Sequence, residues 1–198
     1  ASLSKKNKII SVEALKKTLN EFIKNLNLNS FKNINFFNNS VSDLTGKYIL
    51  FHESINDWES SQTHINFNIK SKLNVKSVTI DTLLGEYDTK NYLVIMKLDM
   101  EGNEINALKG ALVTIKKSEP LIIIEFSKYI LENQGNIDYL KNFLNNYDYS
   151  IYDTKFKKKN LSNILNMIKN LKKKYKTIGN FYLIKNSSSN LKIFLSNE

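Results

Sequence analysis

Carboxylates follow two neighbouring apolar runs of the chain, and these acids are the side chains best suited to chemistry. Asp99 and Glu101 come after the run 92–98, and Glu125 closes the run 121–124. A helical pattern of about fifteen residues joins the two runs. Because parallel strands end at the same edge of a sheet, we expect the acids to meet where α/β enzymes bind ligands. An acid there can accept a proton from a substrate hydroxyl or orient it.

The elements that must position these acids alternate between strand and helix. Expected strands lie at 8–13, 33–37, 47–51, 65–69, 76–81, 92–98, 121–126, 147–152 and 180–185. Expected helices lie at 15–26, 103–117, 137–144 and within 155–176. This order predicts an α/β fold with a mostly parallel sheet and helices on both faces. The runs 47–51 and 65–69 could form a hairpin-like excursion, and the final strand could pair antiparallel at an edge.

Length and composition limit the class of protein. The 198 residues predict a single domain over 1–198, with no linker and no internal repeat. Because cysteine is absent, disulfides and thiolate metal sites are excluded. No apolar run approaches the roughly 20 residues of a membrane helix, and no signal peptide opens the chain. We therefore expect a cytoplasmic protein.

The net charge of +10 suggests an anionic partner, but the kind of basic residue argues against nucleic acid. All 29 basic residues are lysine, and arginine, the preferred phosphate and base-edge contact, is absent. The chain also holds 29 asparagines, a bias that an AT-rich coding sequence would produce. A lysine-rich helical insertion is expected at about 155–178. It could bind anionic headgroups or a phosphorylated substrate, although a solvated helix face is the favoured interpretation.

Several segments of the chain, in order, resemble an FkbM-type methyltransferase, one of the Rossmann-like class I enzymes that use S-adenosylmethionine. The segments are 10–13, 39–43, 77–84, 97–111 and 120–125, of which 97–111 is the most specific. The resemblance implies S-adenosyl-L-methionine as cofactor. It also implies O-methylation of a hydroxyl on a sugar, glycan or secondary metabolite, so the expected partner is a small-molecule or glycan substrate.

The resemblance assigns roles to five residues. Glu13 would bind the ribose hydroxyls of the cofactor, and Ser42 and Asp43 would lie beside its adenine. Asp99 would act on the substrate hydroxyl as base or orienter, and Glu101 would line the pocket. Each has a structural alternative: a helix N-terminal acid for Glu13, loop formation for Ser42 and Asp43, and a helix N-cap for Asp99.

Two acids at neighbouring strand ends, Asp99 and Glu125, could hold Mg²⁺ through oxygen ligands. Two ligands are weak evidence, so the sequence predicts no metal site.

One departure from the family pattern concerns the glycine-rich loop that follows its first strand. The six glycines form no such loop, and Glu13 lies too near Ala1 to leave room for one. We therefore expect an N-terminally truncated domain, with two inner sheet edges unpaired, that is weak or inactive as it stands. The rival hypotheses are a basic module for nucleic acid or an anionic surface, and a non-catalytic remnant of the fold.

Overall fold

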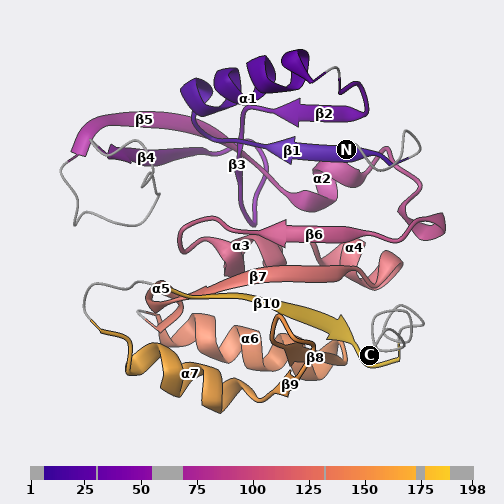
Figure 1. The fold of residues 1–198 in the computed structure, drawn as a ribbon, viewed down its shortest axis with the longest axis vertical. Helices are drawn as coiled ribbons and strands as arrows, with labels where there is room; N and C mark the ends of the chain where they lie inside the picture. The colour runs from indigo at the N-terminus through magenta and orange to yellow at the C-terminus, as the bar shows by residue number, and fades with distance from the viewer. Residues whose placement is uncertain (1–6, 30, 55–68, 132, 173–176, 188–198) are drawn as a thin grey trace.

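The computed structural model describes residues 7–29, 31–54, 69–131, 133–172 and 177–187. Figure 1 shows β1, β2, β6 and β7 pointing in the same direction, with the amino-terminal strands at one end and the carboxyl-terminal strands at the other. Most of the excursion expected at 56–61 and of the strand expected at 65–69 lies outside the described residues. Among the described residues, no helix is both long and apolar enough to cross a bilayer.

The first unit is a parallel pair of strands joined by a helix. β1 (Ile9–Val12) pairs with β2 (Ile34–Phe37), and α1 (Lys16–Leu28) makes the crossover that a parallel pair requires. Two leucines seven residues apart, Leu19 and Leu26, are the buried residues of α1, which matches the helical period. The predicted strands and helix are therefore confirmed here.

The second unit is a three-stranded group. β5 (Ile69–Val78) pairs in parallel with β3 (Ser40–Val41) and antiparallel with β4 (Tyr48–Ser54). The antiparallel pair gives the expected hairpin-like return of the chain, with β5 as its second strand; most of the strand expected at 65–69 lies outside the described residues. The strand expected at 76–81 is the end of β5, which runs from Ile69 to Val78, and residues 80 and 81 belong to α2. After β5, α2 (Ile80–Leu84) begins at Thr79, whose side chain accepts a hydrogen bond from the Thr82 N–H.

The third unit is a five-stranded sheet. Its strand order is β6 (Ile95–Leu98), β7 (Leu121–Ser127), β10 (Thr177–Lys185), β8 (Tyr149–Tyr152) and β9 (Lys158–Lys159). β10 is antiparallel, as predicted, but it lies between β7 and β8 and not at an edge. Its interior position follows from burial on both faces, since Leu183 and Ile184 point to opposite sides and are 0% and 2% exposed.

The prediction of a mostly parallel sheet is wrong. Among the described residues, three strand pairs are parallel and four are antiparallel, so the fold is mixed α/β. The antiparallel pairs arise because the excursion returns as a hairpin and because β10 folds back between two strands that run the other way. Each of β1 and β6 pairs with one strand among the described residues.

One helix expected at 103–117 is two helices. α3 (Glu104–Lys109) ends at Gly110, and α4 (Leu112–Ser118) begins after Ala111. The break comes where the backbone approaches a neighbouring segment, because a Cβ on Gly110 would lie 2.2 Å from the Ser42 carbonyl oxygen. Glycine is therefore required at this contact.

The remaining helices are η1 (Thr89–Asn91), α5 (Lys128–Leu131), α6 (Gln134–Asn146) and α7 (Leu161–Lys169). Within the lysine-rich segment the described helix covers only 161–169, and a short strand, β9, precedes it.

The main core forms between these helices and one face of the five-stranded sheet. Alternate residues of β6 and β7 point into it, and they meet buried residues of α3, α4, α6 and α7. Its fully buried members include Ile122, Ile124, Phe126, Leu108, Ile115, Leu140, Phe143, Ile164 and Ile168. On the opposite face of β6, Ile95 and Lys97 are exposed. Side chains that continue that face beyond β6 therefore reach solvent, which is where the candidate acids lie.

Candidate active site

The turn after β6 carries two of the predicted acids. Glu101 has a φ of 51° and Gly102 a φ of 103°, so two consecutive residues are left-handed. This conformation is uncommon for a residue with a side chain and is easy for glycine. Glu104, the first residue of α3, secures the turn: its Oε1 accepts hydrogen bonds from the Met100 N–H at 2.8 Å and the Gly102 N–H at 3.3 Å. The structural role expected of an acid in the first turn of α3 thus fits Glu104.

Three carboxylates meet at the end of β6 and β7. Carboxylate oxygens of Asp99, Glu101 and Glu125 all lie within 4.8 Å of one another. The parallel register that pairs Leu98 with Ile124 explains why Asp99 and Glu125, the next residues on each strand, are adjacent. The sequence expectation that these acids share one sheet edge agrees with this arrangement.

A lysine reaches the same cluster from the exposed face of β6. The Lys97 Nζ lies 2.5 Å from the Asp99 Oδ2, and both side chains are partly exposed. Residues two apart on a strand share a face, which places Lys97 and Asp99 on the same side of the sheet. This ion pair holds the Asp99 side chain at the rim of the sheet.

The electrostatics of the cluster favour a bound proton or cation. Burial raises the pKa of the Glu125 carboxyl, and the Asp99 carboxylate raises it further, whereas a hydrogen bond from the Thr177 side chain and the charge of Lys97 act in the opposite direction. Burial also raises the pKa of the Glu104 carboxyl, against the lowering effect of the backbone N–H groups that it accepts. Raised carboxyl pKa values are typical of groups that exchange protons in active sites.

The structure decides between the two roles considered for Asp99, and it places Glu101 in the turn before α3. Asn103 occupies the N-cap position of α3, so Asp99 is not the cap of that helix. The helix was expected to begin at residue 103, and α3 begins at Glu104, so Glu101 lies in the left-handed turn that precedes it. That turn, and not the helix, directs the Glu101 carboxylate towards Asp99.

Glu13 lies directly after β1, at the end where Figure 1 places the arrowheads of β1 and β6. Its Oε1 accepts a hydrogen bond of 2.8 Å from the Leu15 N–H, so the structural alternative at the start of α1 is present. The Asn38 side chain donates to the carbonyl oxygens of Glu13 and Ala14, each at 2.9 Å. These bonds hold the end of β1 beside the segment that leads into β3.

Ser42 and Asp43 follow β3 and lie near the Asp99 turn. Ser42 is buried and its Oγ donates to the Asp43 Oδ1 at 3.1 Å, which is local loop chemistry. The Asn103 side chain donates to the Val41 carbonyl oxygen at 2.6 Å, which ties this segment to the start of α3. Through Asn38 and Asn103, the ends of β1, β3 and β6 are joined along one rim.

The sequence model of the family described as "Methyltransferase FkbM domain" matches residues 2–151. The chain belongs to this family. A solved structure, the methyltransferase FkbM from Methylobacillus flagellatus, is 18% identical, with a TM-score of 0.48. The alignment covers 89% of this chain and 36% of that one, so the chain spans about a third of that relative's length. A search of curated proteins gives no match. The family resemblance read from the sequence is thus confirmed.

In this FkbM methyltransferase domain, Glu125 lies beside Asp99, as the sequence predicted, but the sequence assigned it no catalytic role. The neighbours of Glu125 on β10 could not be predicted, because Asn180 and Thr177 meet the end of β7 only through the antiparallel register of β10. Asn180 lies directly opposite Glu125 in that register.

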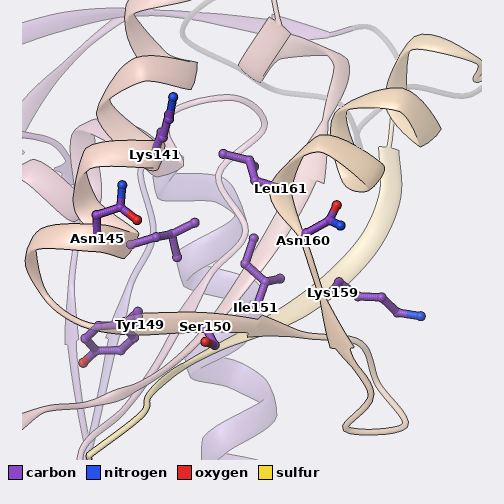
Figure 2. A pocket seen from close by; sticks show the side chains of 9 residues that line it. Lys141, Asn145, Tyr149, Ser150, Ile151, Lys159, Asn160 and Leu161 are labelled. Atoms are coloured by element: carbon purple, nitrogen blue, oxygen red, sulfur yellow. The ribbon is translucent and has the colours of Figure 1, made fainter.

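A shallow polar pocket lies at the opposite edge of the sheet from the acid cluster. Figure 2 shows the labelled lining side chains Lys141, Asn145, Tyr149, Ser150, Ile151, Lys159, Asn160 and Leu161. β8 runs parallel to β7, since both are antiparallel to β10, and the pocket is built at the start of β8 while Glu125 is near the end of β7. Lys159 is paired with Asp153 at 2.9 Å, and the Asn160 side chain caps α7. These groups are thus engaged within the fold.

Proposed function

We propose that this methyltransferase domain transfers a methyl group from S-adenosyl-L-methionine to a hydroxyl oxygen of a sugar, glycan or secondary metabolite. The observation that carries the proposal is the meeting of Asp99, Glu101 and Glu125 at the strand ends of a chain that belongs to the FkbM family. The cofactor, the oxygen acceptor and the class of substrate are parts of the proposal.

The residues at the rim fit the adenosine portion of the cofactor. Glu13 offers a carboxylate at the end of β1, and Ser42 and Asp43 offer side-chain and main-chain groups after β3. Among the described residues, no cluster of glycines offers a loop for the methionine portion. The proposed contacts are therefore those of Glu13 with the ribose and of Ser42 and Asp43 with the adenine.

Bound S-adenosylmethionine supplies an activated methyl group on a sulfonium. The tasks of the chain are to align the acceptor oxygen for in-line attack and to take its proton. Asp99 is our candidate for the residue that accepts or steers the proton, and Lys97 positions it. Glu101, held by the left-handed turn, is our candidate for a second contact to the acceptor hydroxyl.

Calorimetric titration with S-adenosylmethionine and with its demethylated product tests cofactor binding. We expect saturable binding of one molecule per chain and a loss of about tenfold or more in affinity for Glu13→Gln, because a bidentate carboxylate would be replaced by an amide. Glu21→Gln is the matched control, since Glu21 is an exposed acid of α1 paired with Lys24. Wild-type chain that binds neither compound would contradict the proposal.

Transfer of a labelled methyl group to a panel of hydroxyl-bearing sugars tests the acceptor class. Asp99→Asn should lower the turnover rate by about 10²–10⁴-fold, the usual contribution of a positioned acid or base. Its affinity for the demethylated cofactor should stay within about twofold of wild type, since the amide leaves the adenosine contacts in place. Unchanged turnover in Asp99→Asn would refute the proposed role of Asp99 in accepting or steering the proton.

A further inference from the structure

We infer that Asp99, Glu101 and Glu125 bind a hard divalent cation of about the size of Ca²⁺. The inference goes beyond the proposed methyl transfer, because it rests on oxygen ligands of the chain and needs no cofactor. It differs from the sequence prediction of no metal, which weighed only Asp99 and Glu125. The left-handed turn adds Glu101 as a third ligand.

The spacing of the carboxylate oxygens admits a cation of the size of Ca²⁺. They lie within 4.8 Å of one another. Two oxygens bound to one Ca²⁺ can stand about 5 Å apart, twice the bond length of 2.3–2.6 Å, whereas Mg²⁺ with bonds of 2.0–2.1 Å allows only about 4 Å. Ca²⁺ is thus accommodated across the whole of this range, whereas Mg²⁺ needs oxygens no more than about 4 Å apart.

Unpartnered buried oxygens lie on the same face of the sheet as Glu125 and give an independent reason to expect a ligand. Ser127 is 2% exposed, and its Oγ has no hydrogen-bond partner in the part of the chain that the structure describes. Ser127 is two residues after Glu125 on β7, so both point to one face of the sheet. The Asn180 Oδ1, on the residue opposite Glu125, is likewise buried and without a partner in that part of the chain.

Glu104 adds a further unpartnered oxygen beneath the turn. Its side chain is fully buried, and its Oε2 lacks a hydrogen-bond partner among the described residues. Its other oxygen is bound to the N–H groups of Met100 and Gly102, so the carboxylate underlies the turn that carries Asp99 and Glu101. Buried polar groups are nearly always satisfied, and a cation with its bound water would satisfy oxygens of this kind.

The proposed site is open on one side. The Asp99 side chain is 37% exposed, which leaves coordination positions for water or for the oxygens of a substrate. The Lys97 ammonium forms an ion pair with Asp99 on that side, so it should compete with the cation for the Asp99 carboxylate. Competition between a lysine and a metal for one carboxylate gives the site a testable signature.

Calorimetric titration of the wild-type chain with Ca²⁺, after treatment with a chelator, tests the inference. We expect one saturable site, with weaker binding of Mg²⁺ in a parallel titration. Glu125→Gln should weaken Ca²⁺ by more than about tenfold because a charged ligand becomes a neutral one. Lys97→Gln should bind Ca²⁺ several-fold more tightly than wild type. The control Glu21→Gln should bind as wild type does.

The pair of variants keeps the test sharp. A misfolded Glu125→Gln chain could lose binding trivially, but a gain of affinity in Lys97→Gln cannot come from misfolding. Absence of saturable Ca²⁺ binding to the wild type, or equal affinity in wild type and both variants, would overturn the inference. Because the titration contains no S-adenosylmethionine, its failure leaves the proposed methyl transfer to its own tests.

Discussion

Two acids that follow strands, Asp81 after β5 and Asp99 after β6, are held in opposite ways. The Asp81 carboxylate accepts hydrogen bonds from the N–H groups of Val113 and Thr114 and from the Thr114 hydroxyl, at 2.7–2.9 Å. Asp81 therefore provides hydrogen-bond acceptors for the N–H groups in the first turn of α4, although it belongs to a different helix, α2. The Asp99 carboxylate instead faces two other acids and pairs with a partly exposed lysine.

The difference between the two regions indicates that Asp81, and not Asp99, stabilises the fold. Asp81 joins the segment after β5 to α4, and its N–H also donates to the Gly110 carbonyl oxygen at 2.9 Å. Removing it would leave backbone donors without partners. The acids around Asp99 repel one another, which agrees with the proposed role of this cluster as a binding or reactive site.

The largest expected effect comes from the contact beside Asp81. Gly110→Ala should lower the free energy of unfolding by about 2–3 kcal/mol, because the new Cβ would lie 2.2 Å from the Ser42 carbonyl oxygen. Gly85→Ala is the matched control: its Cβ would lie 3.4 Å from the nearest atom, an ordinary contact, and its backbone is right-handed helical. Urea denaturation measures both, and equal stability of the two variants would refute the close contact.

Replacing each aspartate by alanine breaks the comparison directly. Asp81→Ala should cost about 1–2 kcal/mol of unfolding free energy, since it removes a cap of α4. Asp99→Ala should stay within about 0.5 kcal/mol of wild type, because an exposed ion pair contributes little. The same urea experiment gives both values. A larger loss for Asp99→Ala than for Asp81→Ala would show that the assignment of structural and reactive acids is reversed.

The smallest expected effect is a pH dependence that comes from Glu104. Its pKa is raised in the folded state, so folded chain binds this proton more tightly than unfolded chain. Its contribution to stability is present at low pH and is lost as the pH rises through the folded pKa. Glu104→Gln keeps one acceptor oxygen for Met100 and Gly102 and removes the titration.

The stability difference between Glu104→Gln and wild type should therefore shift in favour of the variant as the pH rises from about 4 to 8. Urea denaturation at several pH values measures this difference. A constant difference across the range would contradict the raised pKa. Measurement in the presence of a chelator keeps any cation from offsetting the charge.

The sequence predicted the elements with a clear period better than it predicted their neighbours. α6 was predicted because its apolar residues recur with the helical period, and β7 was predicted because residues 121–124 form a short continuous apolar run. The split at Gly110 was missed, because it depends on a backbone contact with Ser42 that is distant in sequence. The interior place of β10 was missed for the same reason, since strand order is set by packing on both faces.

The candidate site shows the same limit. The adjacency of Asp99 and Lys97 is of the kind that a sequence can indicate, because residues two apart on a strand share a face. Glu101 joins the cluster through a left-handed turn, and a glutamate at that position does not predict this conformation. Asn180 came next to Glu125 through an antiparallel register formed across more than fifty residues of chain, so no local pattern could have indicated it.

Backbone amide resonances of the labelled chain, followed during titration with S-adenosylhomocysteine, test the central claim that the rim at the ends of β1, β3 and β6 binds the cofactor. The account predicts shifts at residues 11–15, 40–45 and 99–104, with Glu13, Asp43 and Asp99 within the affected segments. Unchanged resonances at saturating ligand, or shifts confined to the pocket of Figure 2, would contradict it.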